Sequence, residues 1–141
     1  MSDELQRPGA TTVDLVADAL SANADLSDVA MFTRVLTSSF GQALPADMVD
    51  VDYSRTLADR LAGRPGTATA LRLTFPERRL ELRAGKGWPD AEVQQVVRGV
   101  VLSRKQVPVE EWVRVLAAEL TALAERNAAA RAALAALLGT G

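Results

Sequence analysis

Neither cysteine nor histidine occurs among the 141 residues of this chain. The lack of cysteine excludes a thiolate nucleophile and a disulfide, and the lack of both residue types excludes a Cys/His zinc site. The lack of histidine also excludes an imidazole base and histidine ligation of haem iron. We therefore predict no catalytic, cofactor-binding or metal-binding residue, and we assign no cofactor.

A strong charge of one sign and a long apolar run are also missing. The 16 basic and 18 acidic residues give a net charge of −2, which provides no overall attraction to nucleic acid or to an anionic membrane. No run approaches the ~18 apolar residues that span a bilayer, and the first residues, MSDELQRPGATT, lack a signal-peptide pattern. We expect a cytoplasmic protein that does not contact a membrane. Lys86 and Lys105 are the only lysines beside many arginines and alanines, which is typical of a high-GC bacterial source.

The length fits a single domain that buries a core without metals or disulfides. Residues 1–10 are polar and contain Pro8-Gly9, so we predict a flexible N-terminal tail followed by one domain over residues 11–141. Helices are expected from Thr11 and from Ser27. The second helix carries an apolar stripe at spacings of three and four: Val29, Phe32, Leu36 and Phe40.

After Pro45 the pattern changes to alternation, which predicts a strand over residues 48–53. A short helix with Ser54 as its cap is expected to reach Leu61 and to end at Gly63. Two further strands, over residues 67–75 and 79–84, are separated by a short turn and therefore predict an antiparallel hairpin.

Residues 90–103 are harder to interpret. Asp90 at a capping position and a row of valines at helical spacing favour a helix to about Ser103. Because the valines are β-branched and Gly99 interrupts them, a short strand over residues 100–102 is the alternative.

The last third of the chain, residues 108–138, is the longest periodic segment. Pro108 suits the first helical position and Gly139 suits a left-handed C-terminal cap. Read as a heptad, Leu120, Asn127 and Leu134 fall at a positions, which indicates a possible self-association seam with Asn127 setting the register. The flanking charges are not complementary, and Asn127 before three alanines also fits the cap of a second helix. We favour a helix that packs on its own core over a coiled coil.

Together these segments predict an α+β fold. A small antiparallel sheet of about three strands, including one hairpin, is covered by helices in a two-layer domain with a long C-terminal helix. This order of elements resembles that of small secretion-chaperone domains in architecture alone, because no sequence motif carries the resemblance.

Charged residues follow the predicted strands. Arg72, Arg79 and Arg83 form a basic stripe on the hairpin, which indicates phosphate binding, an acidic partner, or pairing with the acids of the first strand. Asp50 and Asp52 point to one face of that first strand and would suit a divalent cation. Pairing with the arginines is the interpretation that we favour.

Our leading hypothesis is a non-enzymatic protein-interaction module, adaptor-like or chaperone-like, which binds a protein partner or pairs with itself as a homodimer. The alternatives are a nucleic-acid-binding regulator that uses the arginine hairpin and a cation-dependent enzyme that uses Asp50 and Asp52. Trp88, in a Gly-Lys-Gly-Trp-Pro loop, fits an exposed interface anchor. The candidate interaction surface therefore consists of Arg72, Arg79, Arg83, Trp88, Leu120, Asn127 and Leu134.

Overall fold

Two helices precede the sheet. The computed structural model describes residues 12–64 and 66–139, and the predicted tail over residues 1–10 lies outside them. α2 (Thr12–Asn23) is followed by α3 (Val29–Phe40), whose cap is Asp28 because its Oδ1 accepts a hydrogen bond from the Met31 N–H at 3.1 Å. The predicted apolar stripe of α3 is confirmed, since all four of its members are buried: Val29, Phe32, Leu36 and Phe40.

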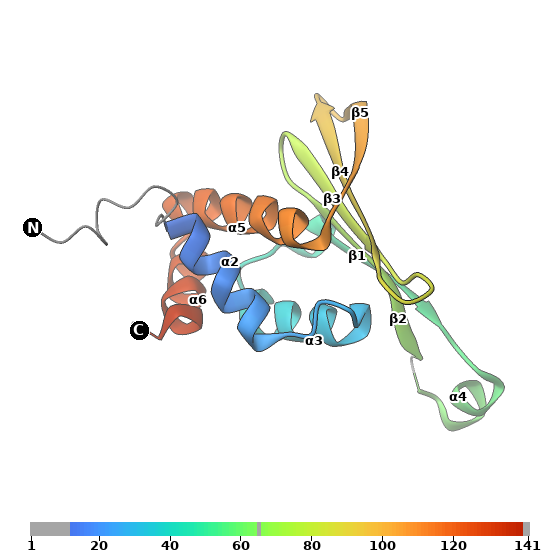
Figure 1. Cartoon of the computed structure of the whole chain (residues 1–141). Helices are drawn as coiled ribbons and strands as arrows, with labels where there is room; N and C mark the ends of the chain where they lie inside the picture. Colours follow the sequence, from blue (N-terminus) through green and yellow to red (C-terminus); the bar gives the residue numbers. More distant parts are fainter. Residues whose placement is uncertain (1–11, 65, 140–141) are drawn as a thin grey trace, which may run out of the picture.

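Five strands form one antiparallel sheet, in which every strand pairs with its neighbours along the chain (Figure 1). A 3-10 helix, η1 (Ala46–Met48), leads into the first of them. The strands are β1 (Val49–Ser54), β2 (Thr67–Thr74), β3 (Arg78–Arg83), β4 (Asp90–Val97) and β5 (Val100–Val107). The predicted first strand and the predicted hairpin, β2 with β3, are confirmed. The predicted total of about three strands is wrong.

The missing strands come from the segment for which we preferred a helix, and that preference is wrong. Residues 90–97 and 100–107 form a second hairpin, joined by a two-residue turn at Arg98 and Gly99. Both turn residues have positive φ, 51° and 80°, which is the combination that a tight hairpin turn with the twist of the strands requires. The valines lie at helical spacings in the sequence, and the strand pairing accommodates this spacing with a register shift between Gln95 and Val96. The strand alternative for residues 100–102 is the one that the structure shows.

The C-terminal segment forms two helices, α5 (Val109–Arg126) and α6 (Ala128–Leu138). Asn127 breaks the segment because its Oδ1 caps α6 by accepting a hydrogen bond from the Ala130 N–H at 3.0 Å. Pro108 occupies the cap position of α5, one residue before the position that we predicted, and Gly139 adopts the expected left-handed cap. A continuous heptad through Asn127 is therefore not formed.

The core lies between the helices and one face of the sheet. Leucines of β2 and β3 meet Trp112 and Leu116 of α5 and Phe32 of α3 in one buried cluster. The rings of Phe32 and Trp112 pack edge to face, with centroids 5.6 Å apart. Trp112 therefore serves the core, although its indole Nε1 finds no hydrogen-bond partner among the described residues.

Helical cover of one sheet face is confirmed, but the simple two-layer description holds only in part. α3 packs against β2 and α5 against β4, whereas α2 and α6 pack mainly against other helices (Figure 1). The helical side is consequently more than one helix deep. None of the helices within residues 12–64 and 66–139 combines the length and the apolar character that crossing a membrane requires.

Candidate interaction surface

The connection between β1 and β2 carries a short helix, α4 (Leu57–Ala62), which projects past the end of the sheet at the lower right of Figure 1. Local hydrogen bonds hold this helix. The Thr56 hydroxyl accepts from the Asp59 N–H at 3.0 Å, and the Asp59 carboxylate accepts from the Thr56 N–H at 3.0 Å. This reciprocal capping box places the cap at Thr56 and not at the predicted Ser54. We call residues 55–64 the arm.

The arm exposes two leucines. Leu57 is 72% exposed and Leu61 is 81% exposed, and neither belongs to the core cluster. Their spacing of four residues places them on one side of α4. Tyr53, the last residue but one of β1, is also exposed. The end of the arm is thus an apolar surface that the rest of the described chain does not cover.

The charges of the arm are mostly positive. Arg55, Arg60 and Arg64 accompany a single acid, Asp59. Arg64 Nε lies 2.9 Å from Asp59 Oδ1, and the Thr56 N–H together with this guanidinium lowers the pKa of Asp59. Asp59 is therefore engaged within the arm, whereas Arg55 and Arg60 form no ion pair with the described residues.

Trp88 lies at the same end of the sheet as the arm, because the loop over residues 84–89 joins the end of β3 to the start of β4. Its side chain is 70% exposed, whereas the neighbouring Pro89 is buried. The structure thus places the predicted anchor residue, Trp88, on the surface and at the same end of the sheet as the arm.

The hairpin arginines occupy a different part of the molecule, the sheet face opposite the helices. Arg72 Nη2 lies 3.0 Å from Asp50 Oδ2 and 2.8 Å from Asp52 Oδ1, and its Nη1 lies 3.1 Å from Glu81 Oε2. The hydrogen bond from Arg72 lowers the pKa of Asp52, and the same bond raises the pKa of Arg72. Arg83 Nη2 reaches the Glu81 carboxylate at 2.5 Å. Arg79 is half-buried beside this network and forms no ion pair with the described residues.

This network gives the predicted acids a structural partner. Asp50 and Asp52 both accept hydrogen bonds from Arg72, as the pairing interpretation expected. Within residues 12–64 and 66–139 no cluster of three or more acidic, histidine or cysteine side chains is arranged to hold a metal ion.

The remaining predicted residues lie inside the helical layer. Leu120 is fully buried and Leu134 is 6% exposed, so neither side chain is available to a partner in this structure. Asn127 is engaged as the cap of α6. The structure therefore brings the candidate residues to three separate places, namely the charged sheet face, the Trp88 loop and the core.

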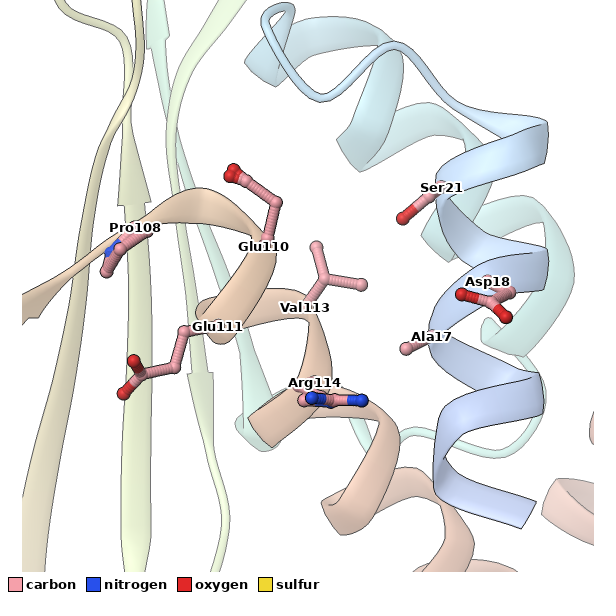
Figure 2. A pocket seen from close by; sticks show the side chains of 8 residues that line it. All are labelled: Ala17, Asp18, Ser21, Pro108, Glu110, Glu111, Val113 and Arg114. Carbon is pink, nitrogen blue, oxygen red and sulfur yellow. The ribbon is translucent and has the colours of Figure 1, made fainter. Parts of the chain in front are cut away.

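A cleft of about 480 Å³ lies between α2 and α5 (Figure 2). Val113 of α5 and Ala17 and Ser21 of α2 face one another across it, whereas Glu111 points away. Arg114, at the same cleft, hydrogen-bonds Asp14. The acids around this cleft do not converge on a common point, so they do not form a binding constellation.

Comparison with protein-family models, with curated proteins and with solved structures yields no match to this chain. Sequence reasoning missed Leu57 and Leu61, because a helix between two strands is ordinarily expected to return its apolar side to the sheet. The available signal was the length of α4: six residues between a cap at Thr56 and a break at Gly63 are too few to fold back over a sheet.

Proposed function

We propose that this chain is a non-enzymatic protein-interaction module that contacts its partner through the arm. The observation that carries the proposal is the exposure of Leu57 and Leu61 on a helix that local hydrogen bonds hold in place. Full burial of a leucine side chain is worth about 1.5–3 kcal/mol, and the fold of the chain provides only a small part of this at Leu57 and Leu61. Exposed apolar groups with polar surroundings are typical of protein contact sites.

The chemistry of the arm indicates the kind of partner. Two leucines four residues apart fit an apolar groove, in the manner of a helix that binds by one face. The guanidiniums of Arg55 and Arg60 favour acidic residues at the rim of that groove. Trp88 provides a second exposed anchor at the same end of the sheet. The expected partner is a protein with an apolar groove and an acidic rim.

The other two functions receive less support from these contacts. Carboxylates already accept hydrogen bonds from Arg72 and Arg83, so the hairpin offers fewer guanidiniums to a phosphate backbone. Asp50 and Asp52 both hold the Arg72 guanidinium, which would compete with a cation.

The test compares three forms of the full chain: wild type, Leu57→Asp with Leu61→Asp, and the control Leu15→Asp, which alters an exposed leucine of α2. Wild type is first used to capture proteins from a lysate of the native source. A captured protein is then purified, and its Kd for each of the three forms is measured by calorimetric titration. We expect the arm variant to raise the Kd at least tenfold, since about 1.4 kcal/mol corresponds to a factor of ten. The control should bind like wild type.

Equal affinity of wild type and the arm variant for the purified partner would overturn the proposal. If wild type forms a dimer in ultracentrifugation and captures no other protein, the arm would instead be assigned to contact with a second copy of the chain. Binding to vesicles of anionic lipid, without a protein partner, would assign it to a membrane.

A further inference from the structure

The strand at the far edge of the sheet, β5, has one side without a neighbour. β4 pairs with its inner side, and β5 is the last strand of the sheet (Figure 1). Among the described elements, β4 alone packs extensively against β5, and residues 102–106 are all exposed. The other edge strand, β1, differs because η1 packs beside it. The outer side of β5 is therefore open to another chain.

The turn of the β4–β5 hairpin determines which backbone groups point inward. Val97 and Val100 flank the two-residue turn, so the N–H and C=O of each point to the other strand. The Val96 N–H points away from β5, since it donates to the Glu77 carbonyl oxygen at 3.0 Å. Because the direction alternates along a strand, the odd-numbered residues of β4 point their backbone groups toward β5.

Two residues of β5 consequently direct their backbone groups outward. The register pairs Gln95 with Ser103, so the backbone of Ser103 points inward and that of Arg104 points outward. The backbone of Gln106, two residues later, also points outward. The backbone groups of Arg104 and Gln106 form no hydrogen bond with the described residues outside the sheet. Each residue offers an N–H and a C=O, which is the arrangement that an added antiparallel strand requires.

The charge around this edge is positive. Residues 93–109 contain three basic side chains, Arg98, Arg104 and Lys105, and no acidic one, although the chain as a whole has a net charge of −2. Successive side chains point to opposite faces of a strand, so Arg104 and Lys105 place a cation on each face of the edge. Arg104 has one ionic contact, with Glu92 at 3.4 Å, and Lys105 forms no ion pair with the described residues.

The same charges disfavour a second copy of the chain at this edge. Antiparallel pairing of two β5 strands along residues 103–107 would bring Arg104 and Lys105 of one copy beside those of the other, and like charges on neighbouring strands repel. Leu102 adds to this effect, because the register shift leaves it without a partner in β4 and bulges interrupt pairing at sheet edges. An acidic strand along residues 103–107 meets neither obstacle.

We propose that the outer edge of β5 binds an extended acidic segment of a partner protein as a sixth strand of the sheet. The backbone of this segment pairs with Arg104 and Gln106, and its carboxylates lie beside the side chains of Arg104 and Lys105. This inference does not depend on the proposed function, because the arm joins β1 to β2 at the other edge of the sheet.

The test uses the ¹⁵N-labelled full chain and three heptapeptides that are blocked at both ends. The peptides alternate valine with glutamate, valine with lysine, and proline with glutamate. We expect the valine–glutamate peptide to shift the amide signals of residues 103–107 in a saturable way. It should also slow hydrogen exchange of the Arg104 and Gln106 amides at least tenfold. The lysine peptide has the wrong charge and the proline peptide does not pair as a strand, so both should bind at least tenfold more weakly.

Gln106→Pro tests the backbone contact. It removes one outward N–H and leaves the pairing with β4 intact, since proline is tolerated on an edge strand whose N–H faces solvent. It should weaken binding of the valine–glutamate peptide at least tenfold, whereas Gln106→Ala should bind like wild type. The exchange measurement uses wild type alone, so it tests strand addition even if Gln106→Pro does not fold.

Arg104→Gln with Lys105→Gln tests the charge contact and should raise the Kd about fivefold. The control, Arg126→Gln with Arg131→Gln, removes the same charge from α5 and α6 and should not change the Kd. The arm variant, Leu57→Asp with Leu61→Asp, should also bind the valine–glutamate peptide like wild type.

Absence of saturable shifts with the valine–glutamate peptide would overturn the proposal. Equal binding of the proline peptide would also overturn it, because attraction of charge alone would then account for binding. Shifts without slower exchange at Arg104 and Gln106, or unchanged affinity of a folded Gln106→Pro chain, would overturn the strand addition. If wild type forms a dimer in ultracentrifugation that Gln106→Pro dissociates, the edge would instead be assigned to a second copy of the chain.

Discussion

A single guanidinium connects three strands on the sheet face opposite the helices. Arg72 of β2 hydrogen-bonds Asp50 and Asp52 of β1 and Glu81 of β3, and its side chain is 24% exposed. The residue was expected on the surface because it alternates with leucines along the strand. Two of its three partners follow directly from the register, which sets Arg72 opposite Asp50 on one side and opposite Glu81 on the other. The third, Asp52, lies two residues after Asp50 and therefore on the same face of β1.

Arg72→Gln tests the contribution of this network. We expect the Tm at pH 7 to fall by about 4 °C, because three carboxylates lose a charged donor in a partly exposed setting. Arg104→Gln is the matched control, because Arg104 is exposed and has one 3.4 Å contact with Glu92. The Tm of this control variant should stay within about 1 °C of that of wild type.

The same variant carries a pH signature. The pKa of Asp52 is lowered from 3.8, so the stabilisation by the ionised carboxylate is complete above pH 3.8 and is lost as the pH falls below it, through the folded-state pKa. The difference in Tm between wild type and Arg72→Gln should therefore shrink below pH 3.8 in calorimetric scans. A difference that is constant from pH 7 to pH 3 would show that the ionised acids do not contribute.

At the scale of elements, the sequence predicts most reliably the segments in which several signals agree. α3 combines a cap at Asp28 with a clear apolar stripe, and the β2–β3 hairpin combines alternation with a short turn. The β4–β5 hairpin was missed because its valines lie at helical spacings, whereas in the structure a turn with positive φ at Arg98 and Gly99 divides them between two strands. The exposure of Leu57 and Leu61 was not predicted, because it depends on how the whole chain packs and a local sequence pattern does not give that information.

The break at Asn127 allows a direct test. Asn127→Ala should lower the free energy of unfolding by about 1 kcal/mol in urea titrations, because the Ala130 N–H loses its side-chain acceptor. Asn127→Asp, which keeps an acceptor at this position, should remain close to wild type. If α5 and α6 instead formed one helix in solution, Asn127→Ala would raise helix stability, since alanine is the better interior residue.

For the molecule as a whole, the helical layer and the sheet share one core, and Leu120 belongs to it. A substitution at Leu120 is therefore expected to destabilise the fold, whereas the heptad pattern alone would predict that it weakens self-association. The apolar residues Val113, Leu116 and Leu120 of α5 are buried against helices and strands of the same chain.

Leu120→Glu should therefore unfold the protein and not merely dissociate it. A carboxylate at a fully buried site costs about 3–5 kcal/mol or more, a large part of the 5–15 kcal/mol that stabilises an ordinary domain. Circular dichroism should show loss of the cooperative thermal transition, whereas Leu102→Glu, at a position that is 63% exposed on β5, should retain it. A folded Leu120→Glu chain with a smaller mass than wild type would contradict this placement of Leu120.

The arm is inserted between two strands that already pair with each other, and its two leucines take no part in the core. Under the proposed function, substitution within residues 55–64 would change what the molecule recognises while the sheet keeps its order and its register. The proposed contact surface and the buried core are then encoded in separate stretches of the chain, so that the first can be replaced without reworking the second. Grafting a different short helix between Ser54 and Gly66 would be a direct way to give the same scaffold a new partner.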